Sequence, residues 1–446
     1  MREPSTCDVV VIGGGLAGLT AAAFLARAGR SVTVLERSSH LGGRATTQAE
    51  DGFSFNLGPH ALYRVGAAAR ILGELGVSYT AGRLRPAPYT LDAWAATSFA
   101  GGPLTLLSTV PDSLRAGLEV AVRADPEALR LTPVRDWLEV ALPDERERAA
   151  LAAYIRVTTY ADEPDRQSAG AVVRQMTLAS DGGVLYLDGG WQTLVAGLGR
   201  AAEEAGARVV TGRRAVRVAR EKAHWRVEQA DGRVERAETT IVATDPRTAV
   251  VLIEAGGATP LSAWAKTAIP LKVACLTVGL SRLPRPDACF DLGVNRPLYL
   301  SVHSAFAHLA PEDGATIHVM KYLRSGIRTD PRADQRELEA LLDLTQPGWR
   351  EVLVQRQLLP SMTVSNALVT AAAGGESGRP APAVPGLPGL YVVGDWVGPD
   401  GMLADAAMAS ARRAAALAGG ERPGPVARSE VAGAARSWRR SEPGQA

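Results

Sequence analysis

The chain has 446 residues, of which 46% are hydrophobic and 22% are charged, and its formal net charge is +2. This size and composition predict a globular protein of two or three domains with a large core. A nearly neutral chain without long basic runs lacks the surface of a nucleic-acid-binding protein. Cys7, Cys275 and Cys289 lie far apart, so neither a disulfide framework nor a metal site is expected, and a reducing, cytoplasmic location fits.

Neither a secretory signal nor a transmembrane segment is expected. Residues 1–8 are polar and lead directly into an apolar strand. The longest apolar stretch, residues 16–28, is short and is interrupted by Gly, Thr and Arg, which favours a buried helix over a membrane span.

The first 36 residues predict a βαβ unit. Residues 8–12 form an apolar, β-branched run that is typical of a parallel strand covered on both faces. A glycine cluster and an Ala/Leu-rich helix follow, and residues 31–36 predict the second strand. The pattern G-x-G-x-x-G lies between the first strand and the helix, where a dinucleotide-binding turn requires it.

Each glycine of this turn has a physical role. Gly13 permits the tight turn, Gly15 lets the backbone approach a pyrophosphate, and Gly18 allows close packing of helix and strand. Leu16 and Ala17 begin the helix, whose N–H groups and partial positive charge attract phosphate. A glycine-rich turn without a ligand is the alternative.

The next residues distinguish between cofactors. Glu36 ends the second strand where an acid accepts hydrogen bonds from an adenosine ribose, and its charge disfavours the 2′-phosphate of NADP. Arg37 follows it, and residues 41–44 form a second glycine turn. Gly43 and Arg44 in this turn suit a phosphate or the edge of a flavin.

Two sets of motifs resemble one known superfamily. Residues 13–18, 35–37, 41–44 and 56–60 are similar to the N-terminal signature of flavin amine oxidases, protoporphyrinogen oxidases and phytoene desaturases, and residues 389–395 and 401–407 resemble its closing FAD motif. The resemblance implies non-covalently bound FAD. It also implies an α/β fold, in which a Rossmann-type, glutathione-reductase-like FAD-binding domain carries an inserted α+β substrate domain.

The resemblance extends the cofactor site along the chain. Gly394 and Asp395 end a strand that can place a carboxylate against the ribityl hydroxyls, although a solvated loop acid or a helix cap is the alternative. Met402 and Leu403 begin a helix whose N–H groups point at a flavin carbonyl, and Trp396 and Met402 either line the substrate side or simply pack. Further positions implied by the resemblance are Gly58, Pro59 and His60 beside the flavin and Val216 at the adenine.

Two side chains are candidates for a catalytic role. Lys272 lies on a strand where amine oxidases place a lysine that holds a water near flavin N5, and His60 lies where the chain passes the flavin. A lysine that reaches solvent and a structural histidine are the alternatives.

Composition along the chain predicts the domain boundaries. The FAD-binding domain is expected to comprise residues 1–82, 189–254 and 386–420, and the substrate domain residues 83–188 and 255–385. Residues 136–153 look helical, and residues 374–388 are a Gly/Pro-rich linker. Residues 421–446 are expected to be disordered, with a short basic helix at a membrane surface left open.

The leading functional hypothesis is an FAD-dependent dehydrogenase or desaturase that acts on a small apolar substrate, similar to phytoene desaturases. An amine oxidase that passes electrons to oxygen and a protoporphyrinogen oxidase remain alternatives. A Rab GDP-dissociation-inhibitor-like binding protein is the non-enzymatic alternative, but the intact glycine pattern and Glu36 argue against it. The electron acceptor, whether oxygen or another, and the oligomeric state stay open.

Overall fold

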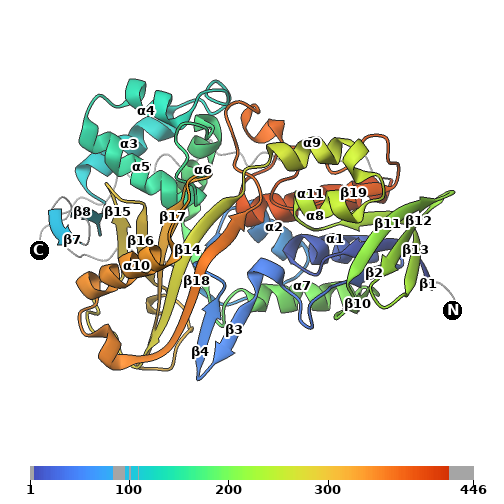
Figure 1. The fold of residues 1–446 in the computed structure, drawn as a ribbon, viewed down its shortest axis with the longest axis horizontal. Coiled ribbons are helices and arrows are strands. Elements are labelled where there is room, and N and C mark those ends of the chain that lie inside the picture. The colour runs from blue at the N-terminus through green and yellow to red at the C-terminus, as the bar shows by residue number, and fades with distance from the viewer. Residues whose placement is uncertain (1–4, 84–95, 100–101, 109, 421–446) are drawn as a thin grey trace, which may run out of the picture.

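A computed structural model of the chain describes residues 5–83, 96–99, 102–108 and 110–420. Two large sheets lie side by side along the long axis of the molecule (Figure 1). The predicted tail, residues 421–446, and residues 84–95 of the predicted substrate domain lie outside the described residues. Among the described helices, none is long and apolar enough to cross a bilayer.

The first sheet contains the predicted βαβ unit. Its strand order is β10-β2-β1-β13-β12-β11, and β19 pairs with β13. β1 pairs in parallel with both β2 and β13, with Val9 opposite Val32 and Thr239. The parallel strands are β1 (Ser5–Ile12), β2 (Val32–Leu35), β10 (Arg208–Val210), β13 (Val234–Val242) and β19 (Leu390–Val392), and the antiparallel ones are β11 (Ala215–Glu221) and β12 (His224–Gln229).

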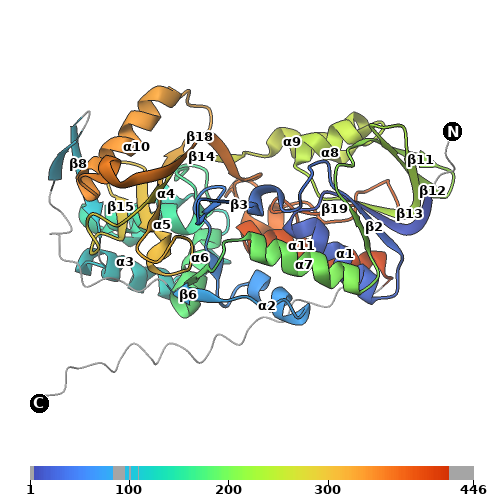
Figure 2. The same cartoon turned by 90° about the horizontal axis from the view of Figure 1, so that it is seen from below.

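Helices cover one face of this sheet and a second layer covers the other. Figure 2 shows α1, α7 and α11 side by side beneath the sheet. The small side chains of Ala21, Ala22 and Ala23 in α1 are fully buried, which permits close approach of the neighbouring backbones. The helices here are α1 (Leu16–Arg27), α2 (Ala67–Glu74), α7 (Gln192–Glu204) and α11 (Leu403–Ala418), and α8 (Pro246–Leu252) and α9 (Pro260–Thr267) lie with the β11–β12 hairpin.

The second sheet is antiparallel and has the order β18-β14-β17-β16-β15-β8-β7. A four-helix layer packs on one face and α10 on the other (Figure 2). The strands are β7 (Ala96–Phe99), β8 (Gly102–Leu107), β14 (Leu271–Leu280), β15 (Phe290–Gly293), β16 (Leu298–Val302), β17 (Ala315–Leu323) and β18 (Leu353–Ser365). The helices are α3 (Asp112–Arg123), α4 (Val134–Ala141), α5 (Glu145–Thr159), α6 (Ala169–Gly182) and α10 (Pro331–Thr345).

Two small sheets connect the halves. One is the hairpin of β3 (Thr47–Glu50) and β4 (Phe53–Asn56), and the other has the order β5-β9-β6, with β5 (Leu62–Tyr63), β6 (Ala81–Arg83) and β9 (Val184–Leu187). Neither was predicted, because strands this short carry little periodicity.

The predicted α/β fold class with a Rossmann-type unit is confirmed. The helical prediction over residues 136–153 is corrected in one detail, since two helices occupy it. Pro143 and Asp144 separate them, and the Asp144 carboxylate caps α5 by accepting hydrogen bonds from the N–H groups of Arg146 and Glu147.

Candidate cofactor and substrate site

The glycine turn contains two glycines that the fold requires and one that it does not. A Cβ on Gly13 would lie 2.6 Å from the Ala243 carbonyl oxygen, and one on Gly18 would lie 1.9 Å from the Gly13 oxygen. A Cβ on Gly15 would meet only the Gly42 carbonyl oxygen, at an ordinary 3.6 Å. Packing within the protein therefore does not explain the glycine at position 15, whereas a ligand lying against its backbone does.

Glu36 lies beside this turn at the end of β2. Its carboxylate is 7% exposed and accepts hydrogen bonds from the N–H groups of Gly14 (2.7 Å) and Ser38 (2.8 Å). The backbone N–H of Arg213 donates to the Glu36 carbonyl, so the segment leading into β11 runs alongside. Val216 is 40% exposed on that strand, close in sequence to this contact, and Arg37 is exposed.

Arg44 of the second glycine turn contacts residues from the C-terminal part of the chain. The Gly42 N–H donates to the Gly14 carbonyl at 2.9 Å, which joins the two glycine turns. Arg44 Nη1 lies 2.7 Å from a carboxylate oxygen of Asp395 and also donates to the Val364 carbonyl. The N-terminal and closing motifs thus meet through an ion pair, and Gly43 lies exposed between them.

Asp395 is a buried acid with several partners. Its side chain is 3% exposed, and it accepts hydrogen bonds from the backbone and side-chain N–H groups of Asn366 as well as from Arg44. Burial would raise the pKa of Asp395, but the Arg44 charge and these hydrogen bonds lower it below its ordinary value. The alternative of a solvated loop acid is therefore wrong.

The closing motif surrounds a small cavity. Asp395, Met402 and Leu403 line it together with Arg379. Leu403 begins α11 with a φ of +56°, a left-handed conformation that is unusual for leucine and typical of functional turns. Gly394 is fixed by hydrogen bonds with the Ser410 hydroxyl.

Trp396 does not line this cavity. It is 2% exposed, packs in the core of the first sheet and donates to the Thr244 carbonyl at 3.0 Å. Of the two interpretations of Trp396, a side chain that packs in the core fits the structure, and a side chain that lines the substrate side does not.

Gly58, Pro59 and His60 lie where the two halves of the molecule meet. A Cβ on Gly58 would collide with the Met362 side chain of β18, and the Tyr160 hydroxyl donates to the Pro59 carbonyl. His60 Nδ1 donates to the Gly58 carbonyl at 2.9 Å, and its ring lies 4.9 Å from that of Trp191. Burial lowers the pKa of His60, so the ring is neutral at pH 7.

Lys272 is exposed at the start of β14, where it is paired in register with Leu323 and Thr363. This position favours the interpretation of a lysine that reaches solvent. We expect Lys272→Met to leave the rate of flavin reoxidation by oxygen unchanged to within about twofold, because an exposed ammonium is hydrated and screened. Stopped-flow reoxidation of the reduced, FAD-loaded protein checks this. A slowing of tenfold or more would instead assign the lysine to the flavin.

Five tyrosines gather where the second sheet, its helical layer and the small β5-β9-β6 sheet meet, a feature that the sequence did not reveal. The pKa of Tyr160 is raised by burial and by the neighbouring phenols of Tyr186, Tyr63 and Tyr322. Two fully buried histidines, His303 and His318, lie beside them, with ring centroids 4.3 Å apart. The phenols of Tyr63, Tyr160, Tyr186, Tyr299 and Tyr322 are here called the tyrosine cluster, and Tyr154 lies near Tyr63.

The tyrosine cluster is mostly apolar in character and lies next to the 58–60 segment. Tyr160 contacts Pro59, and the Tyr63 hydroxyl donates to the Thr158 carbonyl at 2.8 Å. Met320 and Val273 complete the same sheet face. Most of these side chains are buried in the interior of the second half.

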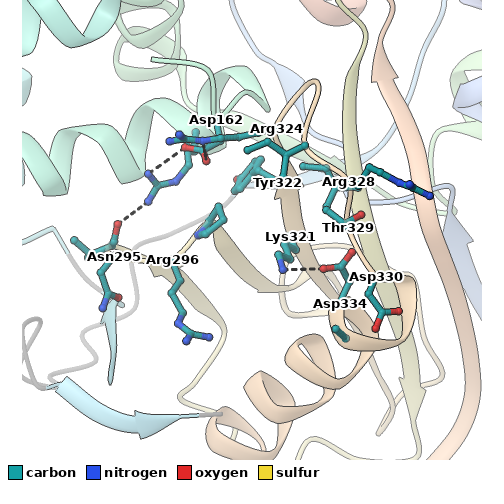
Figure 3. Close-up of a pocket in the computed structure, with 16 residues that line it drawn as sticks. Asp162, Asn295, Arg296, Lys321, Tyr322, Arg324, Arg328, Thr329, Asp330 and Asp334 are labelled. Carbon is teal, nitrogen blue, oxygen red and sulfur yellow. Dashed lines mark hydrogen bonds and ion pairs between the residues drawn. The ribbon is translucent and has the colours of Figure 1, made fainter. Parts of the chain in front are cut away.

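A larger cavity of about 520 Å³ lies in the second half at the end of β17, where Tyr322 of the tyrosine cluster lines it (Figure 3). Half of the residues in its wall are charged, and most of these are paired with each other: Asp162 with Arg324 at 2.8 Å, and Lys321 with Asp334 at 2.7 Å (Figure 3).

Asp405 connects the closing helix to α2. It is 3% exposed, and one oxygen accepts the Ala68 N–H at 2.7 Å while the other has no hydrogen-bond partner among the described residues. Burial raises the pKa of Asp405 from 3.8 to about 6. Because this carboxyl binds its proton more tightly in the folded state, its ionisation lowers stability as the pH rises from about 4 through 6.

We therefore expect Asp405→Asn to be more stable than the native protein at pH 7.5, by about 1 to 3 kcal/mol, and nearly equal to it at pH 4. The amide oxygen still accepts from Ala68. Urea unfolding across this pH range measures the difference, and a difference that does not change with pH would contradict the explanation.

The described residues fit an extended dinucleotide cofactor. Two glycine turns, a helix N-terminus and the carboxylate of Glu36 lie together, and Gly15 leaves its backbone open to a ligand. Within the described chain, no group of three or more His, Cys, Asp or Glu side chains could hold a metal ion. These features define a Rossmann-type nucleotide-binding protein.

Comparisons with known proteins agree with this class. Residues 11–75 match the family described as NAD(P)-binding Rossmann-like domain. Coproporphyrinogen III oxidase of Propionibacterium freudenreichii is 33% identical over 136 residues, which cover 27% of this chain and 26% of that protein. Carotenoid 3,4-desaturase of Haloarcula japonica is 51% identical over 59 residues, 13% of this chain and 12% of that protein. The matched segments thus span about a quarter or less of these relatives.

Solved structures share the fold across nearly the whole chain. An oxidoreductase from Methanosarcina mazei has a TM-score of 0.68 at 17% identity and covers 91% of this chain and 98% of its own. Putrescine oxidase bound to putrescine has a TM-score of 0.66 at 15% identity and covers 93% and 99%. The chain therefore shares the fold of putrescine oxidase and of the Methanosarcina mazei oxidoreductase.

Proposed function

We propose that the chain is an FAD-dependent oxidoreductase that dehydrogenates an apolar organic substrate. The ion pair between Arg44 and Asp395 carries this proposal, because it brings the glycine-turn end and the closing motif of the sequence to one place. FAD is proposed to lie along residues 13–18, Glu36 and the closing motif, on a discontinuous domain of residues 1–82, 189–254 and 386–420.

The proposed roles of FAD and of the protein follow from the chemistry of hydride transfer. FAD, when bound, supplies the acceptor for a hydride at flavin N5. The protein then has to hold the substrate, orient its C–H bond and exclude water, and these tasks need no dedicated acid and base. The buried closing motif, the 58–60 segment and the tyrosine cluster are the elements that support such a dry site.

The character of the tyrosine cluster supports an apolar substrate. Its phenol rings and the buried Met320 and Val273 make this part of the interior mostly apolar, and Tyr322 also lines the 520 Å³ cavity. The name of the relative from Haloarcula japonica, a carotenoid desaturase, agrees with a long hydrocarbon chain.

Amine oxidation is the second candidate, and one observation favours it. Five buried tyrosines could supply the aromatic frame for an amine that the sequence alone did not reveal, and putrescine oxidase shares the fold. Porphyrinogen oxidation is supported only by the name of the Propionibacterium relative.

A two-stage experiment tests the proposal. The purified protein is mixed with excess FAD and gel-filtered, and we expect bound flavin absorbance and thermal stabilisation. A colourless protein without stabilisation overturns the proposal and favours a binding protein without flavin. The yellow protein is then mixed anaerobically with an acyclic polyene in detergent, a primary amine or a porphyrinogen. Bleaching of the flavin by the polyene supports desaturation, and bleaching by only one of the other two selects that alternative.

A further inference from the structure

Arg379 lies in the Gly/Pro-rich segment before β19 that the sequence predicted to be a linker. Its guanidinium donates to two backbone carbonyls, those of Asp395 at 3.2 Å and Gly401 at 2.7 Å. These carbonyls are the two ends of the loop that leads from β19 into α11. Arg379 therefore holds the closing motif in its bent conformation.

The positive charge of Arg379 is not neutralised by a direct ion pair. No carboxylate of the described residues forms an ion pair with its guanidinium within 4 Å, but the carboxylates of Glu376, Asp395 and Asp400 act on it electrostatically from farther away. Its Nε atom is buried and has no hydrogen-bond partner in the described part of the chain. A half-buried cation without a directly paired anion is costly, and it indicates a site where negative charge is received.

The position of Arg379 identifies what it would act on. It lines the same small cavity as Asp395, Met402 and Leu403, the residues proposed to meet the ribityl chain and the flavin carbonyl. Reduction of a flavin places negative charge on that side of the ring, and a nearby cation in a dry site stabilises it.

We propose that Arg379 is a positioning residue that raises the reduction potential of the flavin, by placing a positive charge without a direct ion-pair partner at the closing motif. This inference rests on the proposed FAD site. Arg44 cannot serve the same purpose alone, because the buried Asp395 carboxylate neutralises it.

The charge of Glu376 opposes that of Arg379, so a change at Glu376 is a second test of the proposal. It is 6% exposed, lies 3.2 Å from Arg174, and acts electrostatically on Arg379. Burial raises the pKa of Glu376 to about 7, so at pH 8.5 it is ionised and offsets part of the Arg379 charge. Glu376→Gln should thus have the opposite effect to the loss of Arg379.

The test uses the FAD-loaded full chain at pH 8.5 and measures sulfite affinity by absorbance and the midpoint potential by dye equilibration. Sulfite adds to the flavin and leaves negative charge on the ring, so both quantities report on nearby cations. We expect Arg379→Gln to weaken sulfite binding at least tenfold and to lower the potential by about 30 mV per tenfold. Arg379→Lys should retain most of the native affinity, and Glu376→Gln should strengthen it.

Arg350→Met is the matched control, because it removes an exposed arginine from the far side of the second sheet and should change neither quantity. Equal losses in the Lys and Gln variants, or no change in Gln, would overturn the inference. If Arg379→Gln does not retain FAD, the Glu376→Gln variant decides. Structural damage cannot strengthen sulfite binding, so unchanged or weaker sulfite binding by Glu376→Gln overturns the inference. A native protein that binds no FAD instead overturns the proposed function.

Discussion

Gly15→Ala should yield a folded protein that no longer retains FAD. The new methyl group would meet only the Gly42 carbonyl at 3.6 Å, so the fold accommodates it, yet it would occupy the space that a pyrophosphate needs against the backbone. We expect FAD affinity to fall at least about 100-fold, which corresponds to about 2.7 kcal/mol. Gel filtration with excess FAD and the flavin absorbance of the protein peak measure the loss, and urea unfolding of the apoprotein shows that the fold persists.

Gly73→Ala is the matched control, because a methyl group added to Gly73 in α2 would have no heavy atom within 4 Å. That variant should bind FAD as the native protein does. Retention of stoichiometric FAD by Gly15→Ala, or by the bulkier Gly15→Val, would remove the glycine turn from the cofactor site.

Asp395→Asn should lower the free energy of unfolding, whereas Gly15→Ala should leave the fold intact. The amide is isosteric, but it removes the charge that compensates Arg44 and turns an NH₂ group toward donors of Asn366. Because Arg44 is 43% exposed and partly screened, we expect a loss of about 2 to 4 kcal/mol at pH 7, below that of a fully buried pair.

The pH dependence of this loss has a defined sign. The pKa of Asp395 is lowered by folding, so its contribution is fully present above the ordinary pKa and disappears as the pH falls through the lower, folded value. Urea unfolding from pH 7 to pH 3 should therefore give a constant difference between native and variant proteins above about pH 5 and a shrinking one below about pH 4. Asp313→Asn, an exposed acid, should show little difference at any pH, and a loss for Asp395→Asn that grows toward acid pH would contradict the ion-pair account.

Much of the cofactor site could be predicted because its signals are local. Gly13 and Gly18 are required by contacts within one strand-turn-helix unit, and Glu36 follows on the next strand of the same sheet. The closing strand and α11 were likewise predicted from a short apolar run and a small-residue helix. Motifs of this kind encode their own conformation, so a single sequence reveals them.

The substrate side could not be predicted in the same way. The tyrosine cluster is contributed by β5, α5, β9, β16 and β17, and nothing in the sequence near each tyrosine indicates that the others lie beside it. Arg379 stands in a segment without periodicity, and its two carbonyl partners are identified only by the fold. The exposure of Lys272 depends equally on strand register, which a one-residue shift would reverse.

The bond between Arg44 and Asp395 has a consequence for the order of events during synthesis. These residues are 351 positions apart, so the two halves of the proposed site can meet only after residue 395 has left the ribosome. Long-range closure of this kind slows folding, and a nascent chain that ends before β19 would have its glycine turn without its counterpart. FAD capture would then be a late step that completes folding.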